Sequence, residues 1–481
     1  MAITLPSSSL PPADPQAAPA RGKIRVDATT YLTIYIVLLF AVPSHMTILA
    51  LGTLGNLSVL WGLVGLAWWT FVRVQNLTPV LRGSRPVKAA LVAFFGIVMF
   101  SYGAGQLVGI PSENSAWAEA AFIRSLSWAG VALVAIDGIT HRTRYMTLLR
   151  RLIRGGAMVA VLGLAQFATG QALVNTITLP GFGSEPEYAT VFDRSGFTRA
   201  AGTASHPLAY GTLLVMLLPM SLTMGAAERH LNVFWRWGPS VVLGLATITS
   251  MSRSVLVGLI VGLILIFPTV PRHYRWLTTG IGLGLMVIIS FTVPGMLSSL
   301  RDMFFTTGNE SSSASRTDSL GPAIEIALRN PWLGQGLGSF MPTELILDNA
   351  ILLMFIELGG LGLATFLGVM MVCAWAGLTI WTHDQDSRFK YYGAGLLGAV
   401  ISGLMNMAFY DALSFSMASG LTFLIVGLTG AALGLHRLGP QLDVDDVAFA
   451  PVTVSRAGGG TVQPTGRRAR SRNSDARTDQ V

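Results

Sequence analysis

The chain has 481 residues, of which 52% are hydrophobic and only 12% are charged, about half the charged fraction of an average soluble protein. Its single cysteine, Cys373, excludes an internal disulfide and a metal–thiolate cluster. The formal net charge is +8, but the basic residues are dispersed between apolar segments, which excludes a nucleic-acid-binding face. The composition therefore indicates an integral membrane protein.

Both ends of the chain are polar. Residues 1–28 are rich in Pro, Ala and Ser and end in three basic residues, so we expect a disordered cytoplasmic N-terminal arm. It is not read as a cleaved signal peptide, because the first apolar run starts only near Tyr31 and is long enough to span a bilayer. Residues 437–481 are rich in Gly, Pro and Arg and predict a disordered basic cytoplasmic tail, whose arginines either face solvent or touch anionic lipid.

Residues 29–436 form the predicted transmembrane domain. About twelve apolar runs there have the roughly 17–25 residues that a bilayer crossing needs. Backbone groups in lipid must bond internally, so these runs predict helices, and their continuity argues against a membrane β-barrel. The predicted fold is all-α and polytopic, with spans near 30–50, 54–73, 88–108, 117–137, 153–171, 207–225, 235–250, 254–270, 276–293, 350–380, 391–409 and 413–435.

The distribution of Lys and Arg predicts the orientation. If the N-terminus is cytoplasmic, 25 of the 32 basic residues fall inside, six fall outside, and Arg124 lies within a span. Positively charged loops stay in the cytoplasm, so we expect both termini inside. Two longer outer loops, roughly 172–206 and 294–349, then hold five of the six outer arginines. Arginines concentrated there suggest binding of a substrate, and Arg316 is one candidate.

One stretch, from Ser311 to Leu363, passes from a polar loop into a membrane helix. It contains Asn330-Pro331-Trp332-Leu333-Gly334-Gln335-Gly336-Leu337-Gly338, then Asp348-Asn349, then Glu357-Leu358-Gly359-Gly360-Leu361-Gly362. Turn-formers mixed with apolar residues favour a fixed, packed loop. Polar groups at the mouth of a helix indicate a site at the boundary between water and lipid.

The first outer loop ends in a candidate anion site. Arg199 precedes a helix start at which Ser205 or His206 can be the cap and Pro207 suits the first turn. Helix N-termini attract anions, and guanidinium groups bind phosphate, so Arg199 and, five residues earlier, Arg194 are candidate ligands. The alternative is a plain helix start with solvated arginines. His206 could act in catalysis, although a lone histidine is more often structural.

Two further arginines lie close to lipid. Arg253 sits in a turn of a few residues between two spans, where it must either snorkel or bind an anion. Arg124 lies about two turns into the fourth predicted span, and an intramembrane arginine is a candidate functional residue. Glu357 or Asp411 could be its partner, in a structural ion pair or in a substrate site.

Asp348, Asn349 and Glu357 can line one cavity. Asn349 and Glu357 are about 80° apart around a helix and two turns apart along it. Asp348 is a candidate general base, and the alternative for either Asp348 or Asn349 is a helix N-cap. The chain has no phosphate-binding P-loop, zinc-ligand spacing or nucleophile elbow. Arginines with carboxylates suggest chemistry on an anionic substrate without a bound metal or cofactor.

In three places the chain resembles the O-antigen ligase and O-antigen polymerase superfamily of polytopic membrane glycosyltransferases. These are Arg199 to Pro207 entering a helix, Ser252-Arg253-Ser254 opening another, and the stretch from Asn330 to Gly362. The resemblance covers roughly residues 30–435. It implies a GT-C-like fold of many helices in the cytoplasmic membrane, active on its outer face.

The resemblance also implies an activity. Members transfer a glycan from a polyprenyl-diphosphate donor to an acceptor hydroxyl on a glycan, lipid or protein, without a metal and with inversion. Arginines at the positions of Arg199 and Arg253 would hold the diphosphate, with Asp348 and Asn349 as the other catalytic candidates. Arg194, His206, Arg316, Arg124 and Glu357 are the candidate substrate-binding residues.

One departure from the family pattern bears on the activity. The ligases typically carry His before the Asn, where this chain has Asp348, so a polymerase or a transferase of another glycan is as open as a ligase. A twelve-helix transporter or permease is a second hypothesis, although two similar halves are not evident. A non-catalytic protein that binds lipid-linked glycan is a third.

Overall fold

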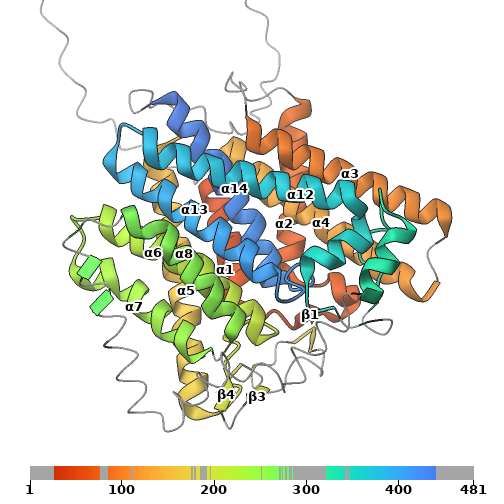
Figure 1. The fold of residues 1–481 in the computed structure, drawn as a ribbon, viewed down its shortest axis with the longest axis horizontal. Helices are drawn as coiled ribbons and strands as arrows, with labels where there is room; N and C mark the ends of the chain where they lie inside the picture. The colour runs from red at the N-terminus through yellow and green to blue at the C-terminus, as the bar shows by residue number, and fades with distance from the viewer. Residues whose placement is uncertain are drawn as a thin grey trace, which may run out of the picture. The chain divides into compact units, whose positions relative to one another are not determined.

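The computed structural model describes residues 27–75, 85–109, 112–174, 180–184, 192–194, 197–250, 252–269, 321–341 and 347–439, with isolated residues between them. The part described is mostly helical (Figure 1). Its longer helices are α1 (Ala28–Ala41), α2 (Leu57–Val74), α3 (Pro86–Val108), α4 (Ser112–Gly138), α5 (Arg142–Thr169), α6 (Pro207–Ala227), α7 (Val233–Thr249), α8 (Arg253–Ile266), α12 (Ala350–His383), α13 (Ser387–Met407) and α14 (Ser416–Leu438).

The remaining elements are short. β1 (Met46–Ile48) pairs antiparallel with β2 (Phe182–Ser184), and β3 (Phe192–Arg194) pairs with β4 (Phe197–Arg199). Two 3-10 helices, η1 (Leu49–Leu54) and η3 (Phe267–Thr269), follow β1 and α8. The β1–β2 pair ties the α1–α2 connection to the first predicted outer loop, which holds β2, β3 and β4.

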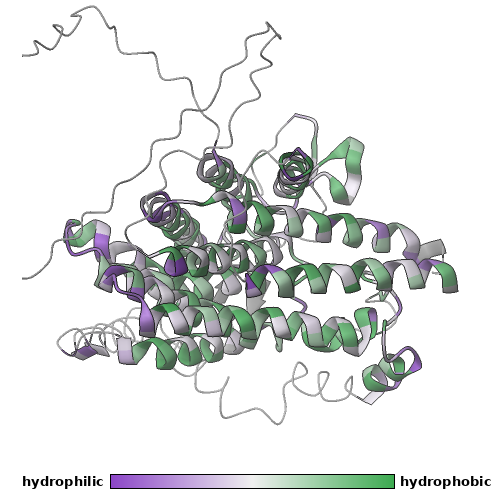
Figure 2. Ribbon diagram, turned by 90° about the horizontal axis from the view of Figure 1, so that it is seen from above, coloured by the Kyte–Doolittle hydropathy of each residue, from purple (hydrophilic) through white to green (hydrophobic). Residues whose placement is uncertain are grey.

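Seven of the described helices are long and apolar enough to cross a membrane, namely α2, α3, α4, α5, α6, α12 and α14. The chain is therefore a multi-pass membrane protein, and Figure 2 shows the long apolar stretches along its helices. The predicted count of twelve spans is not confirmed. The N-terminal arm up to residue 26 and the tail beyond residue 439 lie outside the described residues, as does the predicted span 276–293 apart from isolated residues.

Two helix boundaries differ most from the predicted ones. The helix expected over residues 30–50 ends at Ala41, because Pro43 favours extended backbone at Val42 (φ −85°, ψ 124°). α5 starts at Arg142, eleven residues before its apolar run, because its arginines pair with acids of neighbouring segments. Arg142 bonds Asp384, and Arg150 bonds Glu228.

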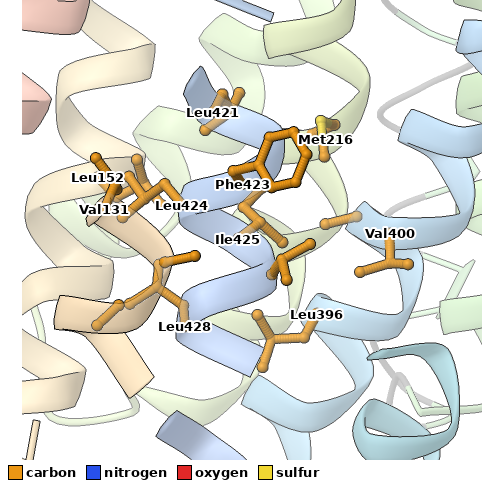
Figure 3. Close-up of a cluster of buried hydrophobic side chains, with 14 of the residues drawn as sticks. Val131, Leu152, Met216, Leu396, Val400, Leu421, Phe423, Leu424, Ile425 and Leu428 are labelled. Carbon is orange, nitrogen blue, oxygen red and sulfur yellow. The ribbon is translucent and has the colours of Figure 1, made fainter. Parts of the chain in front are cut away.

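The core is built around α14 and α6, because 89% of the residues in an 18-residue apolar stretch of each are buried, against 28% for α2 and for α3. Figure 3 shows side chains of α14 meeting four other helices. The labelled residues are Val131 of α4, Leu152 of α5, Met216 of α6, Leu396 and Val400 of α13, and Leu421, Phe423, Leu424, Ile425 and Leu428 of α14. Helices packed this closely hold the loops at their ends in fixed relative positions.

Candidate functional site

The helix α12 is broken near its start, at Gly359. The backbone there has φ 67° and ψ −172°, a conformation that only glycine adopts readily. The loop of residues 331–338 pairs with the broken turn. Gly336 N–H donates to the Glu357 carbonyl at 2.8 Å, and Gly360 N–H donates to the Pro331 carbonyl at 2.7 Å. Non-helical backbone at membrane depth is tolerated where protein satisfies it in this way.

Two glycines allow the loop to touch the helix backbone. A Cβ on Gly334 would lie 2.3 Å from the Glu357 carbonyl, and one on Gly359 would lie 2.4 Å from the Trp332 carbonyl. Ser101 of α3 closes the contact from the side, with its hydroxyl 2.6 Å from the Leu333 carbonyl oxygen; α12 and α3 run side by side (Figure 1). The packed loop that the sequence predicts is therefore part of the wall around the first turns of α12.

A small cavity of about 50 Å³ lies beside this loop. Its walls come from α4, the loop of residues 331–338, the first turns of α12, and the loop of residues 408–415 between α13 and α14. Its polar lining residues are Arg124, Glu357, Asp411 and Ser414, and the others are Ala121, Trp128, Leu337, Gly338, Ala350, Leu353, Met354 and Leu413.

The polar groups of the cavity are held by specific bonds. Arg124 Nη1 donates to the Ser414 carbonyl at 2.9 Å, and the Ser414 hydroxyl donates to Asp411. The Glu357 side chain is 6% exposed and accepts hydrogen bonds from the backbone N–H groups of Gly338 and Phe340. The structure thus brings Arg124 into one cavity with both carboxylates that the sequence offered as its partners.

Asp348 and Asn349 have different surroundings although they are adjacent. Asn349 is the N-cap of α12, where its side chain accepts the N–H groups of Ile351 and Leu352 at 3.0 and 3.1 Å. Asp348 is half-buried and lies within electrostatic range of Asp411. Burial raises the pKa of Asp411, the Asp348 carboxylate adds to the rise, and Ser414 and Arg124 oppose it. Two carboxylates therefore share the mouth of α12.

His206 is the N-cap of α6, since its Nδ1 accepts the Leu208 N–H at 3.1 Å. Burial and the neighbouring Arg199 guanidinium lower the pKa of His206 to about 4. The His206 ring lies 5.4 Å from that of Phe415, in the loop of residues 408–415. The Tyr410 carbonyl of this loop accepts the Ala350 N–H at 3.2 Å. Arg199 and His206 therefore lie at the same end of the bundle as Asp348.

Arg253 begins α8, after the N-cap Ser252. Val255 reaches α6 so closely that a Cβ on Gly211 would lie 2.2 Å from it, so the starts of α8 and α6 are neighbours. Arg194 is placed only by its backbone in β3, and Arg316 lies outside the described residues. Among the described residues, no group of three or more His, Cys, Asp or Glu side chains is placed to hold a metal ion.

Residues 238–367 match the family model described as O-antigen ligase. Over these residues the chain is similar to the O-antigen ligases. This match supports the resemblance to the O-antigen ligase and polymerase-like family, and it indicates a glycan-transferring enzyme of polysaccharide biosynthesis. No curated protein matches the chain significantly.

The region similar to O-antigen ligases contains five of the candidate residues, namely Arg253, Arg316, Asp348, Asn349 and Glu357. The loop of residues 408–415 lies outside it, and the sequence did not predict that this loop forms a wall of the cavity. Asp411 was expected only as a partner of Arg124, and Ser414 was not expected at all. The available signal was a short polar break, Tyr410-Asp411, between two apolar helices.

Proposed function

We propose that the chain transfers a glycan from a polyprenyl-diphosphate carrier to an acceptor hydroxyl, as a glycan polymerase or ligase of the cell envelope. The observation that carries the proposal is the convergence, at one end of the bundle, of the starts of α6, α8 and α12. Each start carries one motif of the ligase-like pattern: Arg199 and His206, Arg253, and Asp348 with Asn349. In the sequence, 47 residues separate His206 from Arg253, and 95 separate Arg253 from Asp348.

Arg199 and Arg253 supply the anion-binding part of the proposal. Arg199 lies beside the start of α6 and Arg253 is the first residue of α8, so two helix N-termini, each with an arginine at or near it, lie at the same end of the bundle. Negative charge grows on the diphosphate as the bond between the anomeric carbon and its oxygen breaks. Cations placed there lower the transition state more than the ground state.

Asp348 is the proposed base. It takes the proton of the acceptor hydroxyl as the hydroxyl oxygen attacks the anomeric carbon, with inversion, and the electron pair of the broken bond leaves with the diphosphate. Asn349 holds the start of α12 and thereby positions Asp348. The proposed chemistry uses arginines for leaving-group stabilisation and calls on no metal.

Arg124 and Glu357 are proposed to contact the substrate from the cavity that they line. Their cavity of about 50 Å³ has room for a few water molecules and not for a sugar ring. A sugar would therefore meet these residues through its hydroxyl groups at the cavity mouth. The same place is where Arg194 and Arg316 would reach the glycan or carrier, from the two outer loops.

We place the site on the outer face of the cytoplasmic membrane, with both termini inside. The described ion pairs of Arg73, Arg142, Arg144 and Arg150 lie at the opposite end of the bundle. A concentration of cations at that end agrees with a cytoplasmic position. The donor would then be a carrier lipid whose glycan faces outward.

The test uses purified protein in liposomes with lipid-linked oligosaccharide from the source organism's membranes. Wild type is expected to release polyprenyl diphosphate, and Arg253→Ala is expected to lower the rate by about a hundredfold or more. Arg388→Ala is the matched control, because Arg388 is also at a helix start but is exposed at the other end of the bundle; its rate should be unchanged.

The products distinguish the versions of the proposal. A ladder of longer lipid-linked chains indicates a polymerase, and a single glycan moved to a separate acceptor indicates a ligase. If wild type releases no carrier with both native substrates present, the transferase is wrong. Uptake of labelled solute by the same liposomes would then support a transporter.

A further inference from the structure

Three cations surround one carboxylate at the end of the bundle opposite the candidate site. Arg73 Nη2 and Lys88 Nζ lie 2.7 and 2.6 Å from Asp137 Oδ2, and Arg85 bonds Asp137 Oδ1. The indole N–H of Trp69 donates to Oδ2 at 2.9 Å. We call Arg73, Arg85, Lys88 and Asp137 the basic cluster. It joins the end of α2, the start of α3 and the end of α4.

The basic cluster carries excess positive charge. Three cations face one carboxylate, and the sequence from residue 75 to residue 85 between α2 and α3 adds Arg82 but no acid. Asp137 accepts one donor from each cation, whereas lysine and arginine each carry several N–H groups. At the edge of a membrane such surplus charge is stabilised by an anion more than by water alone.

The position of the basic cluster suits a lipid headgroup. α2 and α3 are the least buried of the candidate spans, with 28% of the residues in an 18-residue apolar stretch of each buried. The cation side chains are 24%, 19% and 18% exposed for Arg73, Arg85 and Lys88, so a ligand can reach them from the side. A free anion in water would gain nothing from a site beside the lipid-facing helices α2 and α3, whereas a lipid headgroup would.

Apolar side chains flank the basic cluster on the same helices. Phe71 and Val74 on either side of Arg73 are 51% and 75% exposed, and Val92, one turn along α3 from Lys88, is 54% exposed. They offer a surface for acyl chains directly beside the cations. The start of α3 adds backbone N–H groups, because Arg85 provides no side-chain cap.

We propose that the basic cluster binds the phosphate of an anionic phospholipid, whose acyl chains lie against α2 and α3. The phosphate oxygens accept the N–H groups that Asp137 leaves available, and Asp137 holds the cations together when the lipid is absent. This proposal does not rest on the proposed transferase activity.

The experiment measures lipid retained by the full-length protein in detergent, by native mass spectrometry. Phosphatidylglycerol and phosphatidylcholine with the same acyl chains are added separately. Since each cation near an anionic surface is worth about fivefold in affinity, Arg85→Gln/Lys88→Gln should bind phosphatidylglycerol about 25-fold more weakly than wild type. Phosphatidylcholine binding should not change. Arg144→Gln is the control, because Arg144 pairs with Asp27 at the same end and is 48% exposed.

A second variant changes the charge in the opposite direction. Asp137→Asn keeps the cations and removes their carboxylate, so it should bind phosphatidylglycerol at least as tightly as wild type. Asp137→Asn also tests the proposal if the Arg85→Gln/Lys88→Gln variant does not fold. Equal phosphatidylglycerol binding by wild type and the double variant would overturn the proposal, as would a loss of binding in folded Asp137→Asn. If inorganic phosphate stabilised wild type against heat as much as phosphatidylglycerol does, the ligand of the basic cluster would be a free anion and not a lipid.

Discussion

At the scale of single residues, two neighbours at the start of α12, Asp348 and Asn349, have different roles. The side-chain oxygen of Asn349 accepts two backbone N–H groups of the helix, so the structure shows Asn349 as the helix cap. Asp348 precedes this cap residue and lies near Asp411. Either residue could have been the cap from the sequence alone, because Asp and Asn cap helices about equally well.

Because the two residues have different roles, substitutions of Asp348 and Asn349 should affect different properties. Asp348→Asn should lower glycan transfer by about a hundredfold or more, because it removes the proposed base, and it should leave the melting temperature nearly unchanged. Asn349→Ala should cost about 1 kcal/mol of stability, because it removes the cap. Transfer rates and unfolding curves of both variants check this, with Asn349→Asp as the control that keeps a cap. An active Asp348→Asn would rule Asp348 out as the base.

His206 predicts a pH dependence of stability. Its pKa is about 4 when folded, because of burial and Arg199, and about 6.5 when unfolded. Between these values the unfolded chain binds a proton that the folded chain does not, so stability is complete above pH 6.5 and falls as pH drops toward 4. The loss should reach about 3 kcal/mol at most.

The measurement compares thermal unfolding of wild type and His206→Asn from pH 7 to pH 4. Asparagine can cap α6 without titrating, so the difference in stability between the two proteins should shrink or reverse as the pH falls. A difference that stays constant over this range would contradict the assignment.

At the scale of elements, the break in α12 is the feature that the sequence did not reveal. The run from Ala350 to His383 is apolar over most of its length, with Glu357 as its one acidic residue, and glycines are common in membrane helices, so Gly359 gave no clear sign of a break. The packed character of the loop of residues 331–338 was predictable from its turn-formers. Its partner was not, because the contact depends on backbone approach between segments that only the tertiary structure brings together.

The break predicts unequal effects of two glycine substitutions on one helix. Gly359→Ala should destabilise the protein by about 2–4 kcal/mol, because alanine disfavours this φ and its Cβ would meet the Trp332 carbonyl. Gly368→Ala should be neutral or slightly stabilising, because nothing lies within 4 Å of its Cβ. Equal melting temperatures of the two variants would show that the joint between loop and helix is not needed for folding.

At the scale of the whole molecule, charge is distributed unevenly along the helices. One end carries the basic cluster, the Arg142–Asp384–His436 group and the Arg150–Glu228–Tyr392 group. Opposing effects set the state of the two acids. Burial alone would raise their pKa values, but hydrogen bonds from Arg142 and His436 to Asp384, and from Tyr392 and Arg150 to Glu228, outweigh it and lower them. The other end carries the cavity.

Sequence patterns predicted most of this arrangement. Apolar runs located most of the long helices, and the Lys and Arg count separated the two ends. The pattern could not predict which helices lie in the centre, because α14 and α2 are similarly apolar yet differ widely in burial. Nor could it locate the loop of residues 408–415 in the cavity wall, since that position follows from the packing of α13 and α14 against α6, α4 and α12.

The proposed orientation predicts which loops a reagent can reach in intact cells. Gln171, after α5, and Gln385, between α12 and α13, are both exposed and lie at opposite ends of the bundle. Wild type is a suitable background, because its single cysteine, Cys373, is fully buried. A membrane-impermeant maleimide should label Gln171→Cys in intact cells, and it should label Gln385→Cys only after the membrane is opened. The reverse pattern would place the cavity in the cytoplasm, where it would face a carrier lipid before, and not after, its glycan is exported.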